Sequence, residues 1–194
     1  MSASTPRWEW RTFGREFGPA ETRIRAYPLQ RRDSSETYIV SSRPDANTKI
    51  RDELLDLKTL QATDAHGLEL WLPVMKAAFP LTRGPIETTF GVWGLQPPER
   101  LEEPWSQQQF FARVAAYPSL SVIPVTKQRY GGTIDDCLVE VADLTFGGEA
   151  IRTIAVEMAD PARVWRTVRD LGLADYDNVN YVKALKRFLA QRVP

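Results

Sequence analysis

Charged side chains recur at every second position of short, strand-like segments, and this pattern constrains the fold more than any other feature of the sequence. The segment RWEWR alternates Arg7, Glu9 and Arg11 with Trp8 and Trp10. Further charges in this kind of register are Lys49, Arg51, Asp56, Lys58, Lys127, Arg129, Glu140 and Glu157. Because successive side chains of a strand point to opposite faces, each segment would place its charges on one face and its apolar residues on the other.

Two architectures fit this alternation. In an open antiparallel sheet, the apolar face packs on helices and the charged face meets water. In a closed or nearly closed barrel of about eight strands, the charged face lines an interior that admits only side chains or one small ligand. Lysines and arginines gathered there would need a strongly anionic partner, such as a polyphosphate. Glutamates in the same interior are suited to holding Mg²⁺ or Mn²⁺ beside the phosphates. The residues alone leave both architectures open.

The expected elements describe an α+β domain dominated by an antiparallel sheet of about seven or eight strands. Alternation and β-forming residues indicate strands at 7–13, 34–42, 47–60 (a pair around Asp52-Glu53), 84–98, 121–130, 136–146 and 150–159. Gly131-Gly132 is expected to be a turn, and Gly147-Gly148 the turn of a hairpin. Apolar spacing and capping residues indicate helices at 66–81, 104–118 (N-cap Ser106), 160–173 (N-cap Asp160) and 178–191.

Composition narrows the class of protein. The 194 residues fit a single domain at 7–194 after a loose tail at 1–6, and a hydrophobic fraction of 43% can support a core. Lys+Arg and Asp+Glu balance at 25 each, which makes a nonspecific nucleic-acid binder unlikely on global charge. One cysteine and one histidine nearly exclude a zinc site. No segment approaches the ~20 apolar residues of a membrane span, so we expect a cytoplasmic protein. The oligomeric state stays open, with a homodimer among the alternatives.

The order of the motifs resembles the CYTH domain. This triphosphate tunnel metalloenzyme superfamily includes class IV adenylyl cyclases, thiamine triphosphatases and inorganic tripolyphosphatases. The resemblance spans roughly residues 7–185 and rests on short motifs in the order RWEWR, ETYIVS, TKIRD, LDLK, VTKQRY, CLVEVADLTFGGEAIRTIAVEMAD, VWRTVRDLGL and NYVKALKR. It implies an eight-stranded antiparallel barrel, or tunnel, with flanking helices.

The resemblance also implies roles for the charged residues. The phosphate-binding residues would be Arg7, Arg11, Lys49, Arg51, Lys58, Lys127 and Arg129. Glu9, Glu140 and Glu157 would hold Mg²⁺ or Mn²⁺, and Glu9 and Glu157 would be the catalytic residues, holding the ion that orients an attacking water. The ligand would be a triphosphate-type anion, which could be a nucleotide, an organic triphosphate or an inorganic polyphosphate.

The sequence departs from the family pattern where the metal would bind. The family signature on the first strand is Glu-x-Glu-x-Lys, and here the matching residues are Arg7, Glu9 and Arg11. A pair of glutamates on the late strand is replaced by Ala155 and Glu157. Fewer acidic ligands imply a degenerate metal site. The expected function is therefore triphosphate binding, either with a compromised metal-dependent phosphohydrolase activity or as a noncatalytic binding or scaffolding protein.

Overall fold

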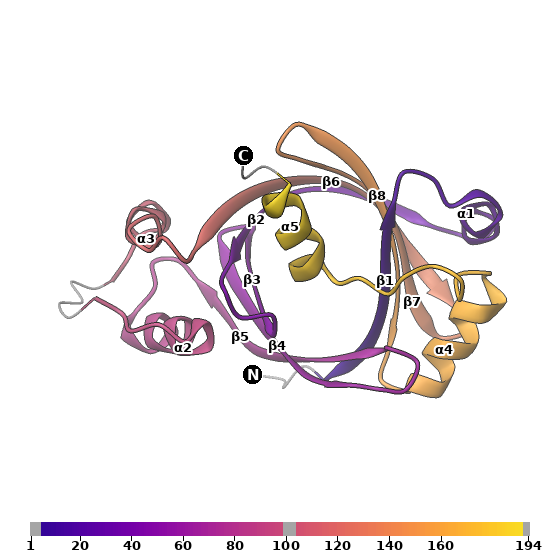
Figure 1. Ribbon diagram of the computed structural model, residues 1–194, viewed down its shortest axis with the longest axis horizontal. Helices are drawn as coiled ribbons and strands as arrows, with labels where there is room; N and C mark the ends of the chain where they lie inside the picture. The colour runs from indigo at the N-terminus through magenta and orange to yellow at the C-terminus, as the bar shows by residue number, and fades with distance from the viewer. Residues whose placement is uncertain (1–4, 99–103, 192–194) are drawn as a thin grey trace.

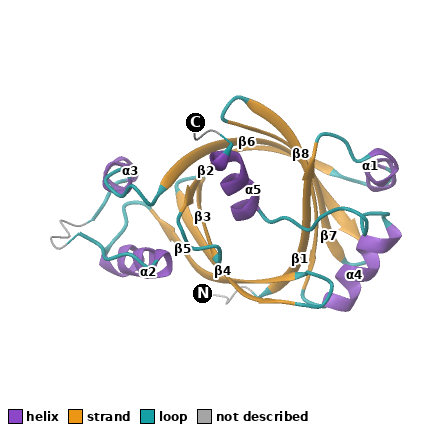
Figure 2. Ribbon diagram, viewed as in Figure 1, coloured by secondary structure: helices purple, strands orange, loops and turns teal. Residues whose placement is uncertain are grey.

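Eight strands close into an antiparallel barrel in the computed structural model, which describes residues 5–98 and 104–191 (Figures 1 and 2). The strand order around the barrel is β1-β5-β4-β3-β2-β6-β7-β8, and β8 pairs back onto β1. The strands are β1 (Arg7–Gly14), β2 (Gln30–Val40), β3 (Ala46–Arg51), β4 (Leu54–Thr63), β5 (Glu69–Ala78), β6 (Ser121–Ile134), β7 (Cys137–Phe146) and β8 (Glu149–Met158). The closed barrel is confirmed. Residues 1–4 of the expected tail lie outside the described residues.

Helices surround the barrel on two sides and cover one of its ends (Figure 1). They are α1 (Gly18–Arg25), α2 (Arg83–Trp93), α3 (Gln107–Val114), α4 (Pro161–Asp170) and α5 (Tyr181–Ala190). Helices α1 and α4 lie beside β1, β7 and β8, whereas α2 and α3 lie on the opposite side. Helix α5 lies over the barrel opening and contacts β2 and β3. No helix in the described part of the chain is long and apolar enough to span a membrane.

The apolar faces of β1, β3, β4 and β8 point outward, toward the helices, whereas apolar residues on the lumen side of β2, β6 and β7 pack against α5. Trp10, Val141 and Val156 pack outside the barrel with Val164 and Val168 of α4. A second apolar cluster joins β2, β3 and β4 to α2 and α3. Because neighbouring residues of a strand face opposite ways, the charged positions between these apolar ones must point into the barrel.

The helix expected at 66–81 is wrong, because residues 69–78 form strand β5, paired with β1 and β4. Trp71 is buried on one face of this strand, and Leu70 and Leu72 are partly buried on the other. Apolar residues on both faces produce a spacing that periodicity cannot distinguish from a helix. Pro73, which has no N–H to donate, lies beside a register shift in the β4–β5 pairing.

The strand expected at 84–98 is also wrong, because residues 83–93 form helix α2. Ile86, Phe90 and Trp93 are fully buried at helical spacing, and Gly94, with a φ of 71°, ends the helix. Burial of this apolar face outweighs the strand preference of the threonines and valine in the segment.

The Gly131-Gly132 turn is a third correction. Strand β6 continues through both glycines to Ile134, and the turn is made by Asp135 and Asp136, both with positive φ. A Cβ on Gly132 would lie 2.6 Å from the carbonyl oxygen of Pro28, so glycine is needed there for a close backbone approach rather than for a turn. The two expected N-caps are confirmed: Ser106 forms a capping box on α3, and Asp160 caps α4.

Candidate functional site

Charged side chains from seven of the eight strands meet in one cavity of about 220 Å³ inside the barrel, which we call the lumen. Its cations are Arg11, Lys49, Arg51, Lys58, Lys127 and Arg129. Its carboxylates are Glu9, Glu36, Asp56, Glu140 and Glu157, and its other lining residues are Tyr38, Asn47 and Tyr181. Six of the seven basic residues named from the sequence thus lie together, as do all three of the named glutamates. Arg7 does not line the cavity; its side chain is half exposed.

Glu36 is the centre of what we call the inner cluster, with Lys49, Arg51, Lys127 and Tyr38. Its side chain is 1% exposed, and one carboxylate oxygen, Oε2, lies 2.7 Å from Lys127 Nζ. The other, Oε1, lies 3.2 Å from Arg51 Nη1 and 3.6 Å from Lys49 Nζ. The Tyr38 hydroxyl donates to Oε2 at 3.0 Å. The sequence analysis missed Glu36, although it stands two residues before Tyr38 and therefore on the same face of β2.

Burial and charge act against each other in the inner cluster. Burial raises the pKa of Glu36, but Lys127 and Lys49 outweigh it and bring the pKa down to about 2. Burial lowers the pKa of Lys49 to about 8, because the attraction of Glu36 compensates only in part. The pKa of Lys127 is lowered for the same reason. Glu36 is therefore ionised at neutral pH, and the charge of Lys49 is lost at mildly alkaline pH.

Arg11 is the centre of a second group, the outer cluster, with Glu9, Glu140, Glu157 and Arg129. Arg11 Nε donates to Glu9 Oε1 at 2.8 Å, and Nη1 lies 3.4 Å from Glu140 Oε1. The other oxygen of Glu140 is held by Arg129 Nη2 at 2.7 Å. Burial disfavours the charged form of Arg11, but Glu9 and its neighbours outweigh it and raise the pKa of the guanidinium well above its usual value.

Two of the carboxylates in the outer cluster face each other. Glu9 and Glu157 are directly opposite on the paired strands β1 and β8. Burial and the charge of Glu9 raise the pKa of Glu157, while Arg11 overcomes burial and lowers the pKa of Glu9. Arg7 approaches Glu157 from outside the cavity, with Nη1 3.6 Å from Oε1. The pair therefore contains one firmly ionised and one more readily protonated acid.

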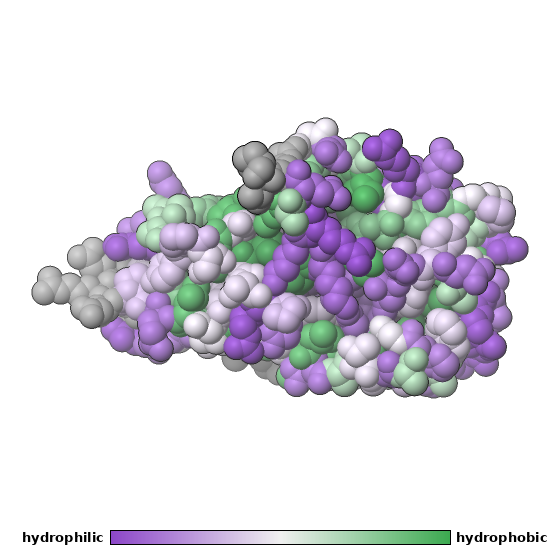
Figure 3. All heavy atoms as spheres, viewed as in Figure 1, coloured by the Kyte–Doolittle hydropathy of each residue, from purple (hydrophilic) through white to green (hydrophobic). Residues whose placement is uncertain are grey.

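One end of the lumen opens into a second cavity, and α5 covers the other end. A wider cavity of about 430 Å³ shares Arg11, Arg129, Glu140 and Glu157 with it and leads outward past Leu138, which is 41% exposed. At the other end, Tyr181 of α5 stacks on Tyr38 with the ring centroids 5.1 Å apart, and apolar side chains of α5 pack behind it. In the space-filling view, no open hole is visible on this face, and hydrophilic side chains gather over α5 (Figure 3). A ligand would therefore enter past the outer cluster.

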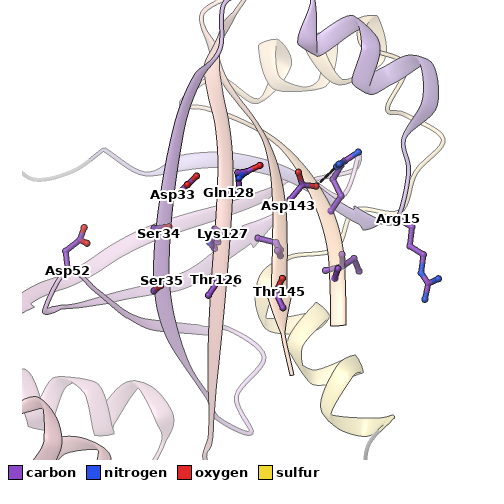
Figure 4. A pocket seen from close by; sticks show the side chains of 14 residues that line it. Arg15, Asp33, Ser34, Ser35, Asp52, Thr126, Lys127, Gln128, Asp143 and Thr145 are labelled. Carbon is purple, nitrogen blue, oxygen red and sulfur yellow. Dashed lines mark hydrogen bonds and ion pairs between the residues drawn. The ribbon is translucent and has the colours of Figure 1, made fainter. Parts of the chain in front are cut away.

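A larger groove of about 1100 Å³ lies on the outside of the barrel (Figure 4). Ser35, Thr126 and Thr145, which help to line it, are opposite one another on β2, β6 and β7, on the face away from the lumen. Its charges have mixed sign, and an ion pair between Asp143 and Arg152 crosses it. This groove lacks the concentration of cations found in the lumen, so its size does not make it the stronger candidate.

The carboxylates of the lumen do not fit a divalent metal as they are arranged. Each glutamate named as a ligand already faces an arginine: Glu9 faces Arg11, Glu140 faces Arg11 and Arg129, and Glu157 faces Arg7. Among the described residues, no group of three or more His, Cys, Asp or Glu side chains is placed to hold a metal ion. A hard cation needs several oxygens free to turn toward it.

Comparison with known proteins identifies the fold. No protein-family model matches the sequence, and no curated protein matches it. Among solved structures, a candidate adenylate cyclase from Bacillus halodurans is 10% identical, with a TM-score of 0.51 over 95% of this chain and 99% of that one. The PH1819 protein of Pyrococcus horikoshii is 12% identical, with a TM-score of 0.50 over 95% and 99%. The PH1012 protein of the same organism is 16% identical, with a TM-score of 0.50 over 90% and 97%. The chain therefore shares the fold of these proteins, in agreement with the CYTH-like barrel that the sequence resemblance implied.

Proposed function

We propose that the lumen binds a triphosphate-type anion, which could be a nucleotide, an organic triphosphate or an inorganic polyphosphate. The observation that carries this proposal is the convergence of six cationic side chains on one enclosed cavity. Phosphate oxygens accept hydrogen bonds from arginine forks and lysine ammonium groups, and cations on different strands can surround a phosphate chain from several sides. The CYTH-like fold agrees with such a ligand, and the Bacillus halodurans neighbour is described as a candidate adenylate cyclase.

The charges within the lumen indicate how such an anion would lie. The inner cluster sets three cations, Lys49, Arg51 and Lys127, around the single carboxylate of Glu36. Its surplus of positive charge would attract the first phosphate to enter. Arg129 lines both the lumen and the wider cavity outside it, and Lys58 lines the lumen, so these two would contact the following phosphates. Arg7, at the rim, would act by attracting the anion rather than by enclosing it.

Hydrolysis of the anion is a second candidate function, favoured by the Glu9–Glu157 pair. A carboxylate with a raised pKa, such as Glu157, is better suited to accept a proton from an attacking water than one held firmly ionised. Glu9, bound to Arg11, would stay charged, and its charge helps to raise the pKa of Glu157. The binding function does not depend on this step, so the two are tested separately.

Thermal unfolding with tripolyphosphate or ATP tests the proposal. An anion that binds only the folded protein should stabilise it by about 2.7 kcal/mol at a concentration 100 times its Kd. Arg129→Gln should weaken binding at least tenfold, because it removes a charge-assisted contact. Arg31→Gln is the matched control: Arg31 is an exposed arginine of the adjacent strand, paired with Asp33 outside the lumen. The absence of any thermal shift with all triphosphates would contradict the proposal.

An assay of phosphate release tests hydrolysis separately. Release by the wild-type protein that Glu157→Gln abolishes would establish hydrolysis.

A further inference from the structure

Arg11 occupies the position in the lumen where the acidic side chains converge. Its guanidinium lies between Glu9 and Glu140, which come from strands on either side of β8. Nη1 also lies 3.4 Å from the Thr153 hydroxyl, and the guanidinium carbon is 4.6 Å from the centre of the Tyr181 ring. A single positive group thus already compensates the carboxylates that a divalent cation would otherwise bridge.

The backbone around Arg11 holds this cation in place. Its N–H donates to the side chain of Asn178 at 2.8 Å, and its carbonyl oxygen accepts from the backbone N–H of Val179. Both partners belong to the segment that leads into α5, the helix that closes the barrel. With a side chain only 9% exposed, Arg11 cannot move aside into water without disturbing this end of the molecule.

We propose that Arg11 is a resident cation that stands in for a divalent metal, so that the lumen binds its triphosphate-type anion without Mg²⁺ or Mn²⁺. This inference rests on the proposed function. A divalent ion bound by Glu9 and Glu140 would lie within a few ångströms of the guanidinium, and like charges at that distance repel strongly in a partly buried site. The anion instead binds cationic side chains of the protein itself, and this binding needs no metal ion.

Titration calorimetry with tripolyphosphate, in EDTA and in excess Mg²⁺, tests the inference on the wild-type protein. Binding is expected in EDTA. Added Mg²⁺ should not tighten it, because the metal gains no ligands in the lumen and only withdraws free tripolyphosphate. Binding that appears only with Mg²⁺, or becomes tenfold tighter, would overturn the resident-cation proposal while leaving the proposed function intact. Absence of binding in both solutions would overturn the proposed function and, with it, metal-free binding of the anion.

Mn²⁺ binding followed by electron paramagnetic resonance, without any anion, tests the role of Arg11 directly. Arg11→Met should bind Mn²⁺ at least tenfold more tightly than the wild type, because it frees Glu9 and leaves Glu140 with one partner. Arg152→Met is the matched control, since Arg152 also bridges two carboxylates, Glu21 and Asp143, but outside the lumen.

This control should gain little Mn²⁺ affinity, which separates the lumen from any freed pair of acids. Arg11→Lys keeps the charge and should bind Mn²⁺ as weakly as the wild type, and it serves if Arg11→Met does not fold. The proposal would be overturned if the wild-type protein or Arg11→Lys bound Mn²⁺ as tightly as Arg11→Met. If Arg11→Met does not fold, a wild-type Kd for Mn²⁺ of micromolar order would overturn it instead.

Discussion

Lys49 is a cation of the lumen whose charge depends on pH just above neutrality. Burial lowers its pKa to about 8, and Glu36 opposes this shift only in part. If the anion binds the protonated form, its apparent affinity should fall by up to about tenfold for each pH unit above 8, as the competent fraction falls. Calorimetry with tripolyphosphate between pH 7 and 9.5 measures this slope.

Lys49→Arg provides the comparison, because an arginine at this position stays charged throughout that range. The ionisation of the anion itself is common to both proteins, so the difference between the two profiles reports Lys49 alone. Identical profiles would mean that Lys49 does not contact the anion in its charged form.

The residues of the site differ in how well the sequence predicts them. Arg11, Lys49 and Lys127 lie in segments whose alternation is regular, so their common face follows from strand geometry. Glu36 lies in a segment without alternating charge, and only the pairing of β2 with β3 and β6 brings it to Lys49 and Lys127. An isolated acid of this kind cannot be assigned to a lumen before the strands that pair with its own are known.

At the scale of elements, α5 decides which end of the barrel is closed, and Asn180 attaches it. The Asn180 side chain caps the helix by accepting from Lys183 N at 2.8 Å, and it donates to the buried carboxylate of Glu69 at 2.7 and 2.9 Å. Asn180→Ala should therefore cost about 2–3 kcal/mol, roughly 1 for the cap and the rest for the bond to the carboxylate. Urea denaturation measures the change.

Asp160 is a matched control, since it caps α4 from an exposed position, and within the described residues its side chain accepts hydrogen bonds from its own helix alone, from Ala162 N and Arg163 N. Asp160→Ala should cost about 1 kcal/mol, the ordinary value of a cap. Equal losses in the two variants would show that the bond to Glu69 does not stabilise the attachment of α5.

The elements that sequence analysis assigned wrongly are the ones whose burial is decided by distant parts of the chain. Strand β5 is covered on both faces, so its apolar residues follow no strand period, and α2 uses strand-forming residues because the barrel wall buries one of its faces. The capped helices were predictable because Ser106 and Asp160 act on their own neighbours. Local signals therefore predict helix ends better than they predict which apolar segment becomes a strand.

At the scale of the whole molecule, the barrel gathers charges from seven strands in its lumen and packs two apolar clusters outside, under helices. The charged alternation alone left an open sheet and a closed barrel both possible, and the resemblance to the CYTH domain implied the barrel. Closure depends on β1 pairing with both β5 and β8, far along the chain. The consequence is a folded state that buries ion pairs. Breaking such a pair by removing one partner is costly, because the other charge is left without compensation.

The stability of the whole protein should consequently fall in acid. Glu36 has a pKa of about 2 instead of 4.5, a difference worth about 3 kcal/mol. Because the unfolded chain binds the proton more readily, this stabilisation is complete above pH 4.5 and is lost as the pH falls toward 2. The lowered pKa values of Glu9 and Glu140 act in the same direction, whereas the raised pKa of Glu157 opposes them.

Urea denaturation of wild-type protein and Glu36→Gln between pH 7 and pH 2 isolates this contribution. The variant should be less stable at pH 7 by about 3–5 kcal/mol, since three cations lose their carboxylate. Its stability should then fall less steeply than that of the wild type below pH 4.5, because it has no Glu36 to protonate. Asp33→Asn, which alters an exposed pair, should follow the wild-type curve. A Glu36→Gln protein whose stability parallels the wild type through this range would mean that the inner cluster does not hold the fold together.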